Sequence, residues 1–265
     1  MRNNFLNDVY SIFLKEMKDF FKDKSMIFMT ILQPLMWLIL MGFGMSGLAS
    51  NNPYIEQILD GSPNYISFLT PGIIIMTALY GGLYGGVTLL NDIRFGYIVK
   101  LLSSPISRRA IIWGKAIATM VQILVQIIIV IVLSCLLGVK YKSGGCGIIA
   151  IIGISMMFTL SMVAISLCLS LVFKTHNAIY SLVSFITLPL MFTSNAMFPN
   201  YNMPAWLMVI TKFNPITYAV KPMRSLMIND FELFEFLFYI GVTILLAIIL
   251  TNLAMHNFGK KYGKI

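Results

Sequence analysis

The residues best suited to contact a partner chain lie in one charged segment, residues 91–109, between two long apolar stretches. Its charged side chains are Asp92, Arg94, Lys100, Arg108 and Arg109. Arginine donates charge-assisted hydrogen bonds to carboxylates and carbonyls, so Arg94 and Arg108 suit a protein contact. Gly96 has no side chain, and a partner's backbone could approach there.

The same segment predicts a short helix. At 100° per residue, its polar positions fall on one narrow stripe, made of Asp92, Gly96, Lys100 and Ser103. Pro105 ends the helix, because proline has no N–H and disfavours helix in the residue before it. Such a helix lies at a membrane surface or against a partner. The alternative is an ordinary basic loop that only fixes topology.

Signatures of catalysis are absent from the sequence. Residues 42–47 match G-x-G-x-x-G, but they close an apolar run and no strand precedes them, so a dinucleotide site is not indicated. No G-x-x-x-x-G-K-[ST], H-E-x-x-H or G-x-S-x-G occurs. The two histidines stand alone, and the three cysteines lack C-x-x-C spacing, so neither a metal site nor a disulfide is expected. We expect no cofactor on this chain and no enzymatic activity from it.

Composition indicates an integral membrane protein, because 58% of the 265 residues are hydrophobic and only 11% are charged. The formal charge of +9 could suggest nucleic acid. The basic residues flank apolar runs, however, and that pattern sets membrane topology. Nucleic-acid binding is therefore not expected.

The predicted fold is all-α, with six membrane spans of about 20 residues or more. These cover residues 25–48, 66–90, 110–138, 147–173, 178–197 and 233–256. Residues 1–24 form an amphipathic helix at the interface, and 257–265 a basic tail. With both termini cytoplasmic, most of the 19 Lys and Arg residues lie inside.

Charge is expected to be absent from the membrane interior. Within 25–90 the only charges are Glu56 and Asp60, and within 117–173 they are Lys140 and Lys142, all in loops. Ion-coupled carriers need intramembrane charges. Energy for transport would therefore come from another chain.

Several motifs, in order along the chain, resemble the type-2 ABC transporter permeases. They are residues 68–72 (FLTPG), 91–96 (NDIRFG), 100–108 (KLLSSPISR), 194–199 (SNAMFP), 203–207 (MPAWL) and 214–220 (NPITYAV) with Arg224. The resemblance is closest to the daunorubicin-resistance-type and nodulation-type export permeases. The chain departs from the pattern at Phe95, Tyr97 and Lys221, which puts the charge pairing at an ATPase contact in doubt.

This resemblance implies a half-transporter that pairs with a second copy of itself or a related permease, above two ABC ATPase subunits that carry ATP and Mg. Residues 91–109 would be the coupling helix. Its ATPase-coupling residues would be Asp92, Arg94, Gly96, Lys100, Leu101, Leu102, Ser104, Pro105 and Arg108.

The resemblance also implies short re-entrant helices over 198–232 at the outer leaflet. Their residues of interest are Asn195, Pro199, Pro204, Trp206, Asn214, Pro215, Tyr218 and Arg224. Lys221 and Arg224 would snorkel to lipid headgroups. Four glycines at G-x-x-x-G spacing predict close helix packing, namely Gly81, Gly82, Gly85 and Gly86.

The sequence thus predicts the permease subunit of an ATP-driven exporter of an amphipathic drug, lipid or lipid-linked molecule. It would lie in the plasma membrane of a prokaryote, in contact with membrane lipids. A polysaccharide or teichoic-acid exporter of the same architecture is an alternative. A structural or signalling membrane protein without cargo is another.

Overall fold

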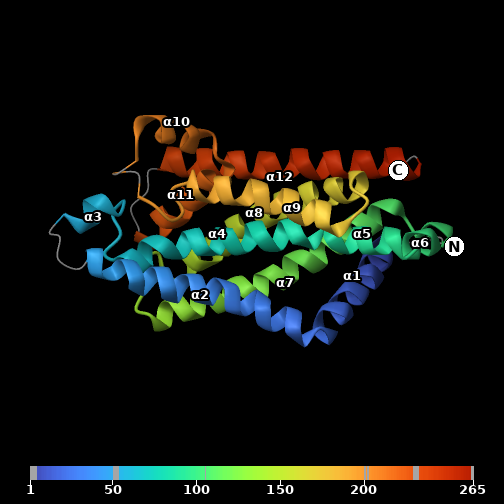
Figure 1. The fold of residues 1–265 in the computed structure, drawn as a ribbon, viewed down its shortest axis with the longest axis horizontal. Coiled ribbons are helices and arrows are strands. Elements are labelled where there is room, and N and C mark those ends of the chain that lie inside the picture. The colour runs from blue at the N-terminus through green and yellow to red at the C-terminus, as the bar shows by residue number, and fades with distance from the viewer. Residues whose placement is uncertain are drawn as a thin grey trace.

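The computed structural model describes residues 5–49, 54–104, 106–199, 201, 203–228 and 233–263. These residues form helices joined by turns and include no strand, which confirms the all-α prediction (Figure 1). In chain order the helices are α1 (Phe5–Lys22), α2 (Lys24–Ala49), α3 (Ile55–Ile58), α4 (Tyr65–Gly85), α5 (Val87–Arg94), α6 (Tyr97–Ser103), α7 (Arg108–Leu136), α8 (Gly144–Val172), α9 (His176–Phe192), α10 (Ala205–Phe213), α11 (Pro215–Ile228) and α12 (Leu233–Tyr262).

Five stretches of the described chain are long and apolar enough to cross a membrane. They are Ile27–Met45, Tyr65–Arg94, Arg108–Leu136, Gly144–Val172 and Leu233–Tyr262. Each falls on a predicted span. The remaining predicted span, 178–197, corresponds to α9, an apolar helix of only 17 residues. At 1.5 Å per residue α9 is about 25 Å long, somewhat short of a hydrocarbon core of about 30 Å. A sixth crossing by α9 stays a prediction.

The end of α9 at Phe192 has a local cause. The Ser194 hydroxyl donates to the Met191 carbonyl over 2.8 Å and accepts the N–H of Ala196 over 3.3 Å. Side-chain bonds of this kind compete with the helical ladder. The chain therefore turns over 193–198, where the sequence predicted further helix.

Helix α4 lies at the centre of the bundle and packs against α2, α7 and α8 (Figure 1). Two of its glycines face α7. A Cβ added at Gly81 would lie 2.7 Å from Ile123 Cγ1, and one at Gly85 would lie 2.3 Å from Thr119 Cγ2. Neither helix could approach the other this closely with a larger residue in α4.

The other two glycines of the repeat face α8. A Cβ at Gly82 would lie 2.6 Å from Met162 Cβ, and one at Gly86 would lie 2.5 Å from Ser166 Oγ. The close approach lets serines of α8 bond the backbone of α4. Ser170 Oγ donates to the Gly86 carbonyl over 2.6 Å. The G-x-x-x-G repeat thus brings α4 against two different helices, one on each side.

Helix α1 has two apolar faces. Val9 and Ile12 are buried against α7, where Gly114 leaves room for Ile12. Leu6 and Tyr10 point outward and are exposed. This arrangement suits a helix held by the protein on one side, and contact of the other side with lipid stays a prediction.

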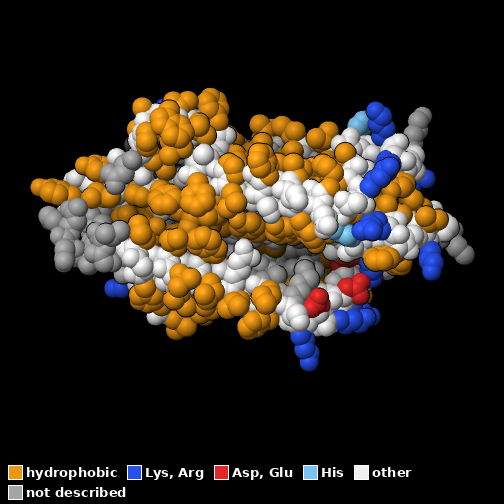
Figure 2. Space-filling model, viewed as in Figure 1, with side chains coloured by type: hydrophobic (Ala, Val, Ile, Leu, Met, Phe, Trp, Pro, Cys, Tyr) orange, Lys and Arg blue, Asp and Glu red, His pale blue; other side chains and the backbone are white. Residues whose placement is uncertain are grey.

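The two ends of the molecule differ in charge. The start of α1, the end of α12 and α6 lie together at one end (Figure 1). Lys and Arg side chains gather there, while the middle of the molecule is covered by hydrophobic side chains (Figure 2).

Candidate coupling site

The charged segment after α4 is two helices rather than one. Helix α5 follows α4 with only Gly86 between them, and α6 begins after Gly96, whose φ is +72°. Glycine adopts this left-handed conformation without a steric penalty. The predicted continuous helix with a single polar stripe is therefore wrong, because the chain changes direction at Gly96. Helix α6 is therefore a separate short helix of seven residues.

Two large apolar side chains are exposed at this break. Phe95 is 83% exposed and Val99 is 65% exposed, and the basic side chains of Arg94 and Lys100 are exposed beside them. We call these four residues the docking patch. Space is open around Gly96, since no atom of the described residues lies within 4 Å of a Cβ built there. The sequence predicted a role for Arg94, Gly96 and Lys100. Phe95 was noted only because it departs from the family pattern.

The opposite side of α6 is anchored in the protein. Ile98 and Leu101 are buried, Leu102 is half-buried, and they pack in one cluster with residues of α7 and α12. Ser104 follows α6 and donates its hydroxyl to the Lys100 carbonyl over 2.7 Å. Pro105, predicted to belong to the coupling set, lies outside the described residues.

The start of α7 is joined to α1. Ser107 caps α7 by accepting the N–H of Ala110 over 3.3 Å, and its own N–H donates to Asp8 Oδ2 over 3.0 Å. Arg108 is half-buried in the first turn, beside Gly263 near the end of α12. The loop after α6 is thus tied to both terminal helices.

Asp92 points into the protein, and its predicted place on one polar stripe with Gly96, Lys100 and Ser103 is wrong. Its side chain belongs to a buried cluster of four charges from α1, α5 and α7, made of Lys15, Glu16, Asp92 and Lys115. Lys115 Nζ lies 2.7 Å from Glu16 Oε1 and 2.6 Å from Asp92 Oδ2. Lys15 Nζ lies 3.0 Å from the same Glu16 oxygen and 3.0 Å from Asp92 Oδ1. We call this group the ion cluster.

The ion cluster has no net formal charge, and each carboxylate lies between two ammonium groups. Lys115 is only 1% exposed although it stands within a membrane-length helix. Lys115 lies just outside the ranges 25–90 and 117–173, in which the only charges are in loops. Its isolation within the predicted span 110–138 was a signal that a carboxylate must lie close to it.

The pKa shifts of Glu16 and Lys15 in α1 follow from these contacts. Burial by itself would raise the pKa of Glu16, but the adjacent Lys115 and Lys15 outweigh burial and hold that pKa below its ordinary value. Burial likewise acts to lower the pKa of Lys15, and Glu16 and Asp92 outweigh it, so the pKa of Lys15 is raised. Both groups are charged at neutral pH.

At the other end of the molecule, α10 and α11 form the predicted short helices. Pro204 precedes α10, Trp206 is exposed on it, and Pro215 opens α11. Asn214 lies between the two helices and connects them to α9, since its Nδ2 donates to the Leu190 carbonyl while its Oδ1 accepts the N–H of Ile216 in α11. Pro199 is half-buried after the turns that follow α9, and Tyr218 Oη donates to the Lys212 carbonyl. Re-entry of these helices into a membrane stays a prediction.

Arg224 does not snorkel outward, and that prediction is wrong. The side chain is almost fully buried, with Nη1 3.0 Å from Asp60 Oδ2. Its Nη2 donates to the carbonyls of Phe68 and Asn195 over 3.2 and 2.8 Å. Arg224 therefore joins α11 to the start of α4 and to the turn after α9. Lys221 is half-buried, and its Nζ lies 3.1 Å from Tyr239 Oη on α12.

Comparison with known proteins fits this architecture. The family model described as ABC-2 type transporter matches residues 7–228, from α1 to the end of α11. The chain belongs to this family. As an ABC-2 permease it is a multi-pass membrane subunit and not the subunit that performs catalysis.

Named relatives of this permease come from algae and bacteria. The chain is 34% identical over 200 residues to the ycf38 transport permease of Porphyra purpurea, covering 75% of this chain and 66% of that protein. It is 32% identical over 233 residues to ycf38 of Cyanophora paradoxa, covering 83% and 76%. A daunorubicin resistance ABC transporter permease protein of Streptomyces coeruleorubidus is 23% identical over 197 residues, covering 74% and 66%. Against the Porphyra and Streptomyces proteins, the permease thus spans just under two thirds of the relative's length.

Proposed function

We propose that this permease is the membrane subunit of an ATP-driven exporter that moves an amphipathic drug, lipid or lipid-linked molecule out of the cytoplasm or the inner leaflet. The observation that carries the proposal is the docking patch. Large exposed apolar side chains rimmed by polar ones mark protein interaction sites. Phe95 and Val99, flanked by Arg94 and Lys100, have that character.

The partner at the docking patch is an ABC ATPase. Two such subunits, one beneath each of two permeases, would supply ATP and Mg, because this chain has no phosphate-binding loop. The second permease is another copy of this chain or a relative. Arg94 and Lys100 favour a partner surface that carries carboxylates.

The ion cluster would carry the movement of the ATPase into the membrane. The docking patch spans the end of α5 and the first turn of α6, and α5 follows directly on α4, the central helix. Asp92 ties α5 to α1 and α7 through Lys15 and Lys115. A displacement of α6 by the ATPase would therefore move three helices together, with Gly96 as the point of bending.

The site of action is the plasma membrane of a prokaryote, with both termini cytoplasmic. Two features support this orientation. The start of α1 and the end of α12 lie on the same side as α6 (Figure 1), and the basic side chains gather there (Figure 2). The drug-resistance name of the Streptomyces relative supports an amphipathic cargo.

A purification experiment tests the proposal. The tagged permease, extracted from its native membranes, should bring down a separate ATP-hydrolysing chain. Phe95→Ala should reduce that association on the order of tenfold, as truncation of an anchoring aromatic commonly does. Phe213→Ala is the matched control, because Phe213 is 82% exposed but lies on α10 at the opposite end. Equal recovery of the ATPase with both variants would contradict docking at this patch, and recovery of no ATPase from native membranes would contradict the function.

A further inference from the structure

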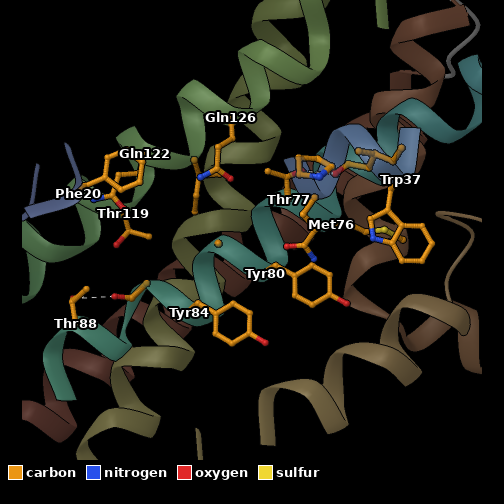
Figure 3. Close-up of a pocket in the computed structure, with 16 residues that line it drawn as sticks. Phe20, Trp37, Met76, Thr77, Tyr80, Tyr84, Thr88, Thr119, Gln122 and Gln126 are labelled. Atoms are coloured by element: carbon orange, nitrogen blue, oxygen red, sulfur yellow. Dashed lines mark hydrogen bonds between the residues drawn. The ribbon is translucent and has the colours of Figure 1, made fainter. Parts of the chain in front are cut away.

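A groove runs between α2, α4 and α7, beside the end of α1. Its cavity is about 120 Å³, and Figure 3 shows the residues that line it. The polar lining residues include Gln33 on α2, Thr77 and Tyr80 on α4, and Gln122 and Gln126 on α7. The groove lies on the membrane-facing length of the bundle rather than at the ATPase end, so the proposed coupling does not account for it.

Two glutamine amides stand near the middle of α7, a helix long and apolar enough to cross a membrane. Helix α7 has 29 residues, and Gln122 is in its middle, with Gln126 one turn further along. Both face α4 across the groove (Figure 3). Gln126 is only 8% exposed. Among the described residues, no protein group forms a hydrogen bond with either amide.

An unpartnered amide at this depth is costly. Transfer of an amide from water to an apolar medium without a hydrogen bond disfavours the structure, and lipid offers no donor or acceptor. A leucine would serve packing better at both positions. The amides are therefore best explained by a polar occupant of the groove, with water in its place when it is absent.

The lining of the groove favours an uncharged occupant. None of the described residues that line the groove is Lys, Arg, Asp, Glu or His. The adjacent cation, Lys115, touches the groove only through Thr88, whose Oγ1 lies 3.4 Å from its Nζ, and it is already paired with Glu16 and Asp92. A charged group in the groove would lose its hydration without gaining a counter-charge.

The apolar part of the lining sets the rest of the chemistry. Trp37, Ile73 and Met76 offer a surface for a ring or a hydrocarbon chain. An engineered protein cavity of about 150 Å³ binds benzene, so this one holds a single ring or a few methylene groups. Most of a larger ligand would remain outside the groove.

We infer that the groove binds an uncharged, hydrogen-bonding group, such as a sugar or an amide, carried on an apolar body. The polar group contacts Gln122 and Gln126, and the apolar body contacts Trp37 and Met76. This inference rests on the proposed export function and narrows its cargo to molecules that are neutral at the groove. A neutral lipid and a neutral soluble amphiphile share this chemistry.

Photolabelling in lipid nanodiscs tests the inference. The probe is a glucosyl diacylglycerol with a diazirine close to the headgroup, and labelled peptides are located by mass spectrometry. Labelling should concentrate on α4 and α7. Gln126→Leu should reduce it on the order of tenfold, because the ligand's polar group loses its partner. Gln122→Leu, at a less buried position, should also reduce labelling. This second variant keeps the test valid if Gln126→Leu fails to fold.

Two further arms define the ligand. Lipids with the same diazirine but a phosphoglycerol or a trimethylammonium head should label the groove at least tenfold less. Competition by phenyl glucoside would identify a soluble amphiphile as a ligand, and labelling without competition would identify a lipid. The control variant is Asn252→Leu, which removes an amide from α12, where Nδ2 only bonds the Ile248 carbonyl.

The results separate this inference from the proposed function, because labelling requires no ATPase. Equal labelling of the parent and both glutamine variants, or equal labelling by charged and neutral heads, would overturn the inference while ATPase association stands. If labelling is as expected but the permease brings down no ATPase, binding in the groove would stand and the proposed export function would be contradicted.

Discussion

Replacing Lys115 by methionine should be among the most damaging single changes at the cytoplasmic end of this permease. The substitution keeps most of the side-chain volume but removes the buried cation between Glu16 and Asp92. These two carboxylates would then face each other with only the partly exposed Lys15 between them. The helices α1, α5 and α7 would lose their common attachment.

The size of the effect follows from the contact distances. An ion pair at 2.7 Å, as between Lys115 and Glu16, has roughly 6 kcal/mol of Coulomb attraction at an effective dielectric constant of about 20. Desolvation offsets much of this, and removing one partner of a buried pair costs about 3–5 kcal/mol in practice. At about 2–4 °C per kcal/mol for a chain of this size, the melting temperature should fall by roughly 6–20 °C.

Thermal unfolding of the purified permease in nanodiscs is the assay. Lys100→Met is the control, because it makes the same chemical change at an exposed position and should alter stability by about 0.5 kcal/mol or less. Adding Glu16→Gln to Lys115→Met restores the charge balance, so the double variant should be more stable than the sum of the single effects predicts. Equal melting temperatures for Lys115→Met and Lys100→Met would refute the role of Lys115. So would a double variant whose loss of stability equals the sum of the losses from Glu16→Gln and Lys115→Met.

Three other changes test separate parts of the structure. Arg224→Met should remove the guanidinium that pairs with Asp60 and donates to the Phe68 and Asn195 carbonyls, cost about 3–5 kcal/mol, and speed limited proteolysis around α11. Unchanged cleavage would contradict this role of Arg224. Gly86→Ala should force α4 from α8 and lower the melting temperature, while Gly241→Ala, with open space around it, should not. Acidification should destabilise the parent more than Glu16→Gln, because the pKa of Glu16 is lower in the folded protein than in the unfolded chain. The charged carboxylate therefore stabilises the fold at pH values above its unfolded pKa, and this stability is lost as the pH falls through its folded pKa. Parallel pH curves for the two proteins would contradict the last prediction.

Features that depend on neighbours in sequence could be predicted from the sequence. Apolar runs of membrane length gave the spans, and the two-faced pattern of residues 5–22 gave α1. G-x-x-x-G spacing pointed to close packing at α4, because the repeat puts small residues on adjoining faces of one helix. These signals need no knowledge of the partner helix.

Features that depend on distant residues could not be predicted in the same way. The direction of Asp92 is set by Lys15, which is 77 residues away, and by the turn at Gly96. Arg224 pairs with Asp60 across 164 residues. A basic residue near an expected outer surface suggests snorkelling until its buried carboxylate partner is known. The glutamines of α7 were visible in an apolar run, but only the groove shows that they face the same space.

The ion cluster has a consequence for how this permease can diverge over evolutionary time. Its two ammonium and two carboxylate groups balance, so a single charge-changing substitution leaves the cluster with an uncompensated net charge. Drift at these positions should proceed by paired replacements, with the loss of Lys115 accompanied by the loss of Glu16 or Asp92. Lineages should therefore carry either the whole balanced set or a smaller neutral one, and substitutions at sites 99 residues apart in the chain should be correlated.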